Sequence, residues 1–261
     1  MIDTLTLLGG RGKDGQPEPV QRLEMHMGDV VSIVGPTGSG KTTLINDLEL
    51  FANANTPSGR RMLVNGQPAP AEYRYDPSRN PIALITQHTT FLSDLPVSEF
   101  LTTHAQIRAR TPEQAEGKVR ETLDFANQLT GEPILLESRM TELSGGQTRS
   151  LLIADAVVVC HTPIVLLDEV ENAGINRTRT LELLRQHRKI FIFVTHDPRI
   201  TLLSDYRVVM QNGCITSVLR TDENERRMAV RVGKMDDVLS RLRESLRLGQ
   251  RLVPEQLEAL S

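Results

Sequence analysis

Aromatic residues are scarce in this chain of 261 residues, which has no Trp, three Tyr and six Phe. None of them precedes Phe51. Cysteine is equally rare: Cys160 and Cys214 lie far apart and show no metal-ligand spacing. Both occur in apolar surroundings, so we expect buried free thiols and a reducing compartment. A disulfide-stapled secreted fold is excluded.

A positive field is also lacking. The 30 Lys and Arg residues are balanced by 33 Asp and Glu, for a formal net charge of −3. The chain as a whole therefore does not attract nucleic acid, and we expect no direct nucleic-acid partner. Long apolar runs are missing too, since Leu151–Cys160 and Ile190–Val194 fall short of the roughly 18 residues that a membrane span needs. Work at a membrane would require a partner.

What the chain does have is a glycine-rich segment between an apolar run, Val30–Val34, and a helix-forming stretch, residues 43–50. Its glycines let successive backbone N–H groups face inward around phosphate oxygens, at the positive end of the following helix. The lysine can reach the β- and γ-phosphates, and the hydroxyl that follows it can ligate Mg²⁺. The strand and helix on either side argue against a chance turn. The candidate nucleotide-binding residues are Gly35, Pro36, Thr37, Gly38, Ser39, Gly40, Lys41, Thr42 and Thr43.

The rest of the chain alternates between strand and helix patterns. Helical periodicity runs from about Val97 to Cys160, and apolar strands return on either side of it. Alternation of this kind predicts an α/β fold with a largely parallel sheet. The expected strands are residues 2–8, 20–26, 30–34, 61–65, 82–86, 164–167, 190–194, 206–210 and 215–219. A polar, helical tail over 222–261 is expected to pack its apolar stripe on the core; a basic surface for lipid or nucleic acid is the alternative.

Four further elements follow Lys41 in a fixed order. Gln87 ends one strand pattern, and Leu143-Ser-Gly-Gly-Gln147 opens a helix. Asp168 and Glu169 end a buried strand, and His196 follows another. A single polar residue at the end of a strand is usually structural. The joint occurrence of all of them is not explained that way.

This set resembles the ATP-binding cassette (ABC) ATPases over roughly residues 1–220, with Leu143–Gln147 matching the family signature letter for letter. The resemblance implies a P-loop NTPase core with a mostly parallel sheet, a small antiparallel β-subdomain and an inserted α-helical subdomain. The expected ATPase domain covers 1–221, with the core at 1–87 and 161–221, the helical subdomain at about 88–160 and a helical extension at 222–261. Two copies would enclose two ATP molecules.

The resemblance also implies a role for each motif. Asp168, Thr42 and the Gln87 side chain would hold Mg²⁺. Glu169 would be the general base, and His196 would contact the γ-phosphate. Gln87 and His196 are thus catalytic candidates beside Glu169. The signature residues Ser144, Gly145, Gly146 and Gln147 would bind the ATP of the other subunit, as a helix N-terminus can.

Two features depart from the family pattern. No aromatic residue precedes the phosphate loop, and Arg11 or Lys13 is offered where adenine is normally stacked; we expect Arg11 to stack on the base. After Glu169 the chain reads Val170-Glu-Asn-Ala-Gly-Ile-Asn176 instead of a short loop that begins with proline and ends in Leu-Asp. In the family this loop crosses the dimer interface, so the resemblance implies that the coupling between the two ATP sites differs here.

The resemblance favours the ATPase subunit of an ABC transporter, cytoplasmic and held at the inner membrane face by a membrane-spanning permease. Residues 89–96 would contact that permease. The alternative is a soluble, non-transport ABC ATPase in cofactor or metal-cluster assembly or in nucleic-acid transactions. Either way we expect a homodimer, or a dimer with a related subunit, that hydrolyses ATP.

Overall fold

The chain folds around two sheets, as described by a computed structural model for all residues except 1, 77–78, 92–93, 109–110, 170–176 and 253–261. In the described part, the first sheet is antiparallel with the strand order β2-β1-β4-β5. Its strands are β1 (Thr4–Leu8), β2 (Arg22–His26), β4 (Arg61–Val64) and β5 (Gln67–Pro68). The turn at Asn65-Gly66, where Asn65 has a φ of 50° and Gly66 a φ of 76°, joins β4 to β5 as a hairpin.

The second sheet has the order β10-β9-β3-β8-β7-β6. Its pairs are parallel except for β9 with β10, which form a hairpin. The strands are β3 (Val30–Val34), β6 (Ile82–Thr86), β7 (Ile164–Asp168), β8 (Ile190–Val194), β9 (Tyr206–Gln211) and β10 (Cys214–Arg220). The predicted strands are therefore present, with ends that differ by one or two residues.

The central strands are apolar on both sides because both faces of the sheet are covered. In β7, Ile164 and Leu166 face a core shared with α1 (Lys41–Glu49) and the antiparallel sheet, whereas Val165 and Leu167 face a second core shared with the helical region. The twofold alternation of side chains along a strand delivers them to the two cores. The same strand therefore ties the two halves of the molecule together.

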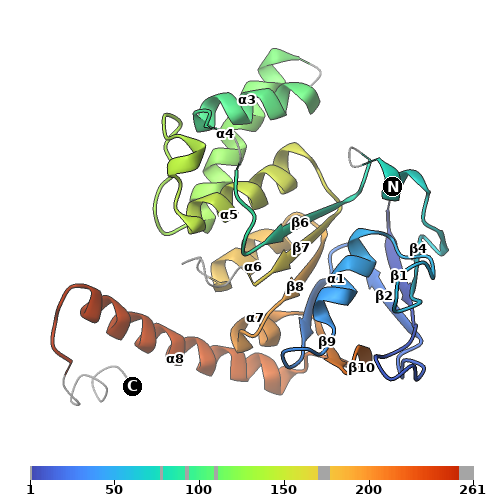
Figure 1. Cartoon of the computed structure of the whole chain (residues 1–261). Coiled ribbons are helices and arrows are strands. Elements are labelled where there is room, and N and C mark those ends of the chain that lie inside the picture. Colours follow the sequence, from blue (N-terminus) through green and yellow to red (C-terminus); the bar gives the residue numbers. More distant parts are fainter. Residues whose placement is uncertain (1, 77–78, 92–93, 109–110, 170–176, 253–261) are drawn as a thin grey trace.

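The helical region follows β6 and ends before β7. In Figure 1, α3 and α4 lie away from the antiparallel sheet, with α5 between them and β7. Its elements are α3 (Val97–Arg108), α4 (Pro112–Leu129), the short 3₁₀ turn η1 (Met140–Glu142), α5 (Gly145–Ala154) and the π-helical turn η2 (Asp155–Val159). Helix α4 begins with Thr111 as its N-cap and Pro112 in its first turn, a standard helix start.

The remaining helices are α2 (Glu72–Tyr75), α6 (Arg177–Arg185), α7 (Pro198–Leu203) and α8 (Glu223–Arg247). Helix α8 packs against α7, where Arg199 pairs with Asp236 at 3.3 Å, and then runs beyond it (Figure 1). The expectation that its apolar stripe packs on the core is wrong: Met235 is 66% exposed and Leu246 58%. The helix extends past the surface that the stripe would have covered. None of the described helices combines the length and apolar character that a membrane span needs.

Candidate functional site

The glycine-rich loop joins β3 to α1, as the sequence predicts. Gly40 is the N-cap of α1 with a φ of 100°, a conformation that side chains rarely adopt, and a Cβ there would lie 2.8 Å from the Cα of Gly213. The Lys41 ammonium donates to the carbonyls of Gly35 at 2.8 Å and Pro36 at 3.2 Å. Lys41 thus curls over its own loop, where a phosphate oxygen would compete with those carbonyls for its protons.

A cavity of about 440 Å³ opens over this loop and is lined by residues from four separate segments. They come from the loop and α1, from the ends of β7 and β8, and from the turn that contains Lys13. Because parallel strands end at the same edge of a sheet, the carboxyl ends of β3, β7 and β8 meet there. The lining residues are Lys13, Thr37, Gly38, Gly40, Lys41, Thr42, Thr43, Ile45, Asp168, Glu169, Val194 and His196.

Glu169 and His196 face each other in this cavity. Glu169 Oε1 lies 3.6 Å from His196 Nε2, and both side chains keep substantial exposure to solvent. The backbone of Glu169 has a φ of 52°, in the left-handed region, and its N–H donates to the Val194 carbonyl at 2.9 Å. Asp168 and Glu169 both line the cavity, whereas successive residues of a regular strand point to opposite faces, so the left-handed backbone at Glu169 breaks the alternation of the strand.

Gln87 lies beyond Thr86, the partner of Asp168 in the parallel register of β6 with β7. It is not among the residues that line the cavity. The Gln87 carbonyl accepts a hydrogen bond of 2.9 Å from Arg149 on α5. Sequence reasoning missed this arginine, although its place two residues after the signature motif puts it on the same helix. Arg149 links the end of β6 to the helix that carries the signature.

The signature residues form the start of α5. Ser144 is the N-cap, its hydroxyl accepts from the Gln147 N–H at 3.3 Å, and the Gln147 side chain accepts from the Ser144 N–H at 2.9 Å. This reciprocal capping box satisfies two of the backbone donors that a helix start leaves open. The segment Ser144–Gln147 does not line the cavity above the phosphate loop of its own chain.

Lys13 reaches the phosphate loop, which the sequence left as one of two options. Its ammonium donates to the Gly38 carbonyl at 2.7 Å, and its backbone N–H donates to Asn212 at 2.9 Å. Arg11 is exposed and does not line the cavity. The structure thus brings Lys13, and not Arg11, to the loop. The predicted differences at 170–176 lie outside the described residues.

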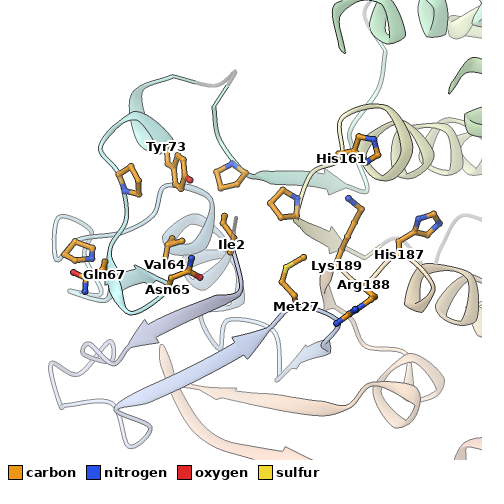
Figure 2. A pocket seen from close by; sticks show the side chains of 14 residues that line it. Ile2, Met27, Val64, Asn65, Gln67, Tyr73, His161, His187, Arg188 and Lys189 are labelled. Atoms are coloured by element: carbon orange, nitrogen blue, oxygen red, sulfur yellow. The ribbon is translucent and has the colours of Figure 1, made fainter. Parts of the chain in front are cut away.

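A larger pocket, of about 670 Å³, opens at the other edge of the parallel sheet (Figure 2). Pro81, Pro163 and Lys189, which line it, directly precede β6, β7 and β8. In Figure 2 the Lys189 side chain points toward His161, with His187 and Arg188 nearby. None of the predicted nucleotide-binding residues lines this pocket, so size alone does not identify the nucleotide site.

Comparison with known proteins agrees with this geometry. The family model described as ABC transporter matches residues 21–172. An uncharacterized ABC transporter ATP-binding protein of Methanocaldococcus jannaschii is 44% identical over 259 residues, 99% of this chain and 98% of that protein. The sulfate/thiosulfate import ATP-binding protein CysA of Synechococcus elongatus is 30% identical over 203 residues, 75% of this chain and 56% of that protein.

Solved structures share the fold. The chain matches cbiO1 from Clostridium perfringens, part of the cbiONQ ABC transporter complex, with a TM-score of 0.65 and 22% identity over 92% of this chain and 100% of that one. A dimeric ATP-binding cassette bound to ADP and Pi matches with a TM-score of 0.64 and 20% identity over 84% of this chain and 99% of that one.

The P-loop fold and the motif set therefore define an ABC-type ATPase, and the α/β class predicted from the sequence is confirmed. The chain belongs to the ABC transporter ATP-binding proteins. It is an ATP-binding, ATP-hydrolysing subunit of an ABC transporter, so the transporter hypothesis is confirmed over the soluble, non-transport alternative.

Proposed function

We propose that ATP occupies the cavity of about 440 Å³ with its phosphates on the loop Gly35–Thr43. The backbone N–H groups of the loop and the Lys41 ammonium would neutralise the phosphate charge. The observation that carries this proposal is the convergence of Lys41, Glu169 and His196, from three separate elements, on one polar cavity. Positioned charges of this kind supply most of the catalysis in phosphoryl transfer.

Glu169 is proposed as the general base that orients and deprotonates the attacking water. It is a carboxylate in the cavity. Its neighbour His196, with Nε2 3.6 Å from Glu169 Oε1, can contact the γ-phosphate and help to position the same water. The left-handed backbone at Glu169 supports this role, because strained conformations are concentrated at functional sites. Gln87 is proposed to join Glu169 and His196 as a catalytic residue once nucleotide is bound. It directly follows β6, and its backbone carbonyl accepts a hydrogen bond from Arg149.

Mg²⁺ is proposed to bind with the nucleotide. Thr42 and Asp168 line the same cavity and offer a hydroxyl and a carboxylate, which are the oxygen ligands that Mg²⁺ prefers. Gln87 would add an amide oxygen. When bound, the metal would neutralise charge on the phosphate oxygens.

The nucleotide is further proposed to be shared between two copies of the chain. Ser144, Gly145, Gly146 and Gln147 lie at a helix N-terminus that does not line the cavity of their own chain. In a head-to-tail homodimer, or in a dimer with a related subunit, they would face the γ-phosphate bound by the other copy. Loss of that phosphate would then weaken the dimer.

The partner is proposed to be an integral membrane permease, with the chain at the cytoplasmic face of the membrane. Its contact segment would be residues 89–96, at the start of the helical subdomain (about 88–160), where that subdomain adjoins the core at 1–87 and 161–221. There Phe91 packs against Phe100 with ring centroids 5.0 Å apart, and Leu95 is 36% exposed. Support comes from relatives described as import ATP-binding proteins and as part of a transporter complex. The tail at 222–261 is proposed to be an extension beyond the ATPase domain at 1–221.

Replacement of the proposed base tests the site. Glu169→Gln should still bind ATP but hydrolyse it at least 100-fold more slowly, as expected for loss of general-base catalysis. Glu182→Gln, an exposed change on α6, is the matched control and should hydrolyse ATP at the wild-type rate. Steady-state phosphate release and ATP binding by calorimetry measure the two properties. Unchanged turnover in Glu169→Gln would remove Glu169 from the proposed role.

A further inference from the structure

Three metal-ligating side chains meet in the helical region, away from the nucleotide cavity. His104 comes from α3, Asp155 begins η2, and Cys160 follows η2. His104 Nδ1 lies 3.1 Å from Asp155 Oδ2, and Cys160 Sγ lies 3.7 Å from the same oxygen. One ligand atom from each residue falls within 4.8 Å of the other two. The sequence spacing of the cysteines did not predict this cluster, because its members are 51 and 5 residues apart.

The π-helical turn brings two of the three together. Cys160 donates its N–H to the Asp155 carbonyl at 2.9 Å, a bond between residues five apart. In an α-helix, residues three and four apart share a face, whereas a π turn stacks residue i+5 over residue i. The insertion therefore aims the thiol of Cys160 at the carboxylate of Asp155. Such π turns are rare and occur frequently at functional sites.

Packing holds the third ligand, His104, in place and leaves the cluster accessible to a metal ion. The His104 ring stacks on Phe100 with centroids 4.4 Å apart, which holds the imidazole next to Asp155. Asp155 is 7% exposed, so its carboxylate is held within the protein. The side chain of His104 is 39% exposed, and Cys160 is half-buried instead of fully buried as the sequence predicted. A metal ion could reach the cluster from the His104 side.

The separations suit a tetrahedral transition metal. Zinc bonds of about 2.0–2.1 Å to nitrogen and oxygen and about 2.3 Å to sulfur, at tetrahedral angles, place N and O about 3.4 Å apart and O and S about 3.6 Å apart. The corresponding distances here are 3.1 Å and 3.7 Å. A carboxylate, a thiolate and a neutral imidazole balance the charge of Zn²⁺. The thiol and imidazole disfavour Mg²⁺ and Ca²⁺, which select oxygen ligands.

We propose that His104, Asp155 and Cys160 bind one Zn²⁺ ion, with water as the fourth ligand. The ion would tie α3 to η2, which directly follows α5, and these three residues are the one metal-ligating cluster found in the described part of the chain. Its role is to hold those two elements in register. This site is independent of the nucleotide cavity, and its test does not depend on ATP hydrolysis.

Cobalt is the probe for the test, because a thiolate ligand gives Co²⁺ a charge-transfer absorption that oxygen ligands cannot. Full-length protein is stripped with a chelator, kept reduced and titrated with Co²⁺ and then Zn²⁺ in the absence of nucleotide. One equivalent of Co²⁺ should produce the thiolate band, and Zn²⁺ should remove it. The matched pair is Cys160→Ser, which should lose the band, and Cys214→Ser, which should keep it. His104→Ala should bind Zn²⁺ at least tenfold more weakly.

A second measurement uses only the wild-type chain. Zn²⁺ should slow alkylation of Cys160 at least tenfold while leaving Cys214 unchanged, as read by mass spectrometry of the labelled peptides. A thiolate band that persists in Cys160→Ser, or no band and no protection in the wild type, overturns the proposal. The cluster would then be a His104–Asp155 hydrogen bond with a cysteine beside it.

Discussion

Arg60 and Glu18 form an ion pair in which both side chains are 0% exposed. The guanidinium also bonds Asp47 on α1 at 2.9 Å and the Gly213 carbonyl at 2.7 Å. Gly213 in turn donates to the Ser39 carbonyl in the phosphate loop at 2.8 Å. Burial by itself lowers the pKa of Arg60, but hydrogen bonds to Glu18 and Asp47 outweigh it and raise the pKa. A buried charge network therefore lies directly behind the nucleotide site.

Removal of this arginine should destabilise the fold. Arg60→Met leaves Glu18 and Asp47 buried without their counter-ion, and breaking a buried pair costs about 3–5 kcal/mol. The adjacent Arg61→Met is the control, because Arg61 is exposed and should change stability by less than about 0.5 kcal/mol. Urea denaturation measures both. A loss below about 1 kcal/mol in Arg60→Met would contradict the network's structural importance.

Ser144 should have two separable effects, one on stability and one on assembly. Ser144→Ala removes the N-cap of α5 and should cost about 1 kcal/mol. Thr111→Ala removes the N-cap of α4 and should cost about the same. In a Glu169→Gln background, only Ser144→Ala should also abolish ATP-induced dimerisation, measured by analytical ultracentrifugation. Equal dimerisation in the two cap variants would argue against a shared nucleotide site.

Lys13 should contribute to nucleotide affinity. Its ammonium already donates to Gly38, and an exposed charge near a phosphate is worth about 0.5–1 kcal/mol. Lys13→Met should therefore weaken ATP binding about two- to fivefold in a calorimetric titration. Arg11→Met tests the competing hypothesis that Arg11 stacks on adenine. A larger loss of affinity in Arg11→Met than in Lys13→Met would favour Arg11 as the residue that holds the base.

Lys189 should make stability rise with pH. Burial lowers its pKa from 10.5 to about 8; the charge of Cys160 opposes this lowering, and the charge of Lys118 adds a smaller lowering. Below pH 8 the folded and unfolded chains both carry the proton, so the cost of burying the charge is fully present. Between pH 8 and 10.5 the unfolded chain binds more protons, and the free energy of unfolding rises. The full difference corresponds to about 3 kcal/mol.

Lys189→Met should remove that dependence. At pH 7 the variant should be more stable than wild type by about 1–3 kcal/mol, since loss of the hydrogen bond to the Thr162 carbonyl offsets part of the gain. The exposed Lys234→Met should leave both stability and its pH dependence unchanged. Urea denaturation at pH 7 and pH 10 decides the matter: a variant that gains as much stability with pH as the wild type would contradict the assignment.

The strand ends were predictable from the sequence because apolar runs stop where polar site residues begin. Val30–Val34 leads to Gly35, and Ile164–Leu167 leads to Asp168, so the pattern locates one edge of the parallel sheet. The fold class and the family follow from these positions and the signature. The catalytic roles of Glu169, His196 and Gln87 remain predictions that the proposed variants test.

Other features depend on contacts that no local pattern contains. Lys13 meets Gly38 across 25 residues, and Arg60 meets Glu18 across 42. The stripe on α8 has the period of a packed helix, yet Met235 stays exposed, because periodicity states which side is apolar and not whether a neighbour covers it. The cluster at His104 needed the π turn, which has no reliable sequence signal.

At position 169, the residue that best suits the left-handed backbone is not the residue that the proposed chemistry requires. Such a conformation costs about 1–2 kcal/mol for any side chain with a Cβ, and glycine would escape that cost. A search for more stable variants of this chain would therefore converge on glycine at 169 and return a well-folded protein without the carboxylate proposed to act on water. Screens for thermostable variants of this enzyme should therefore select for the rate of ATP hydrolysis and not for melting temperature alone.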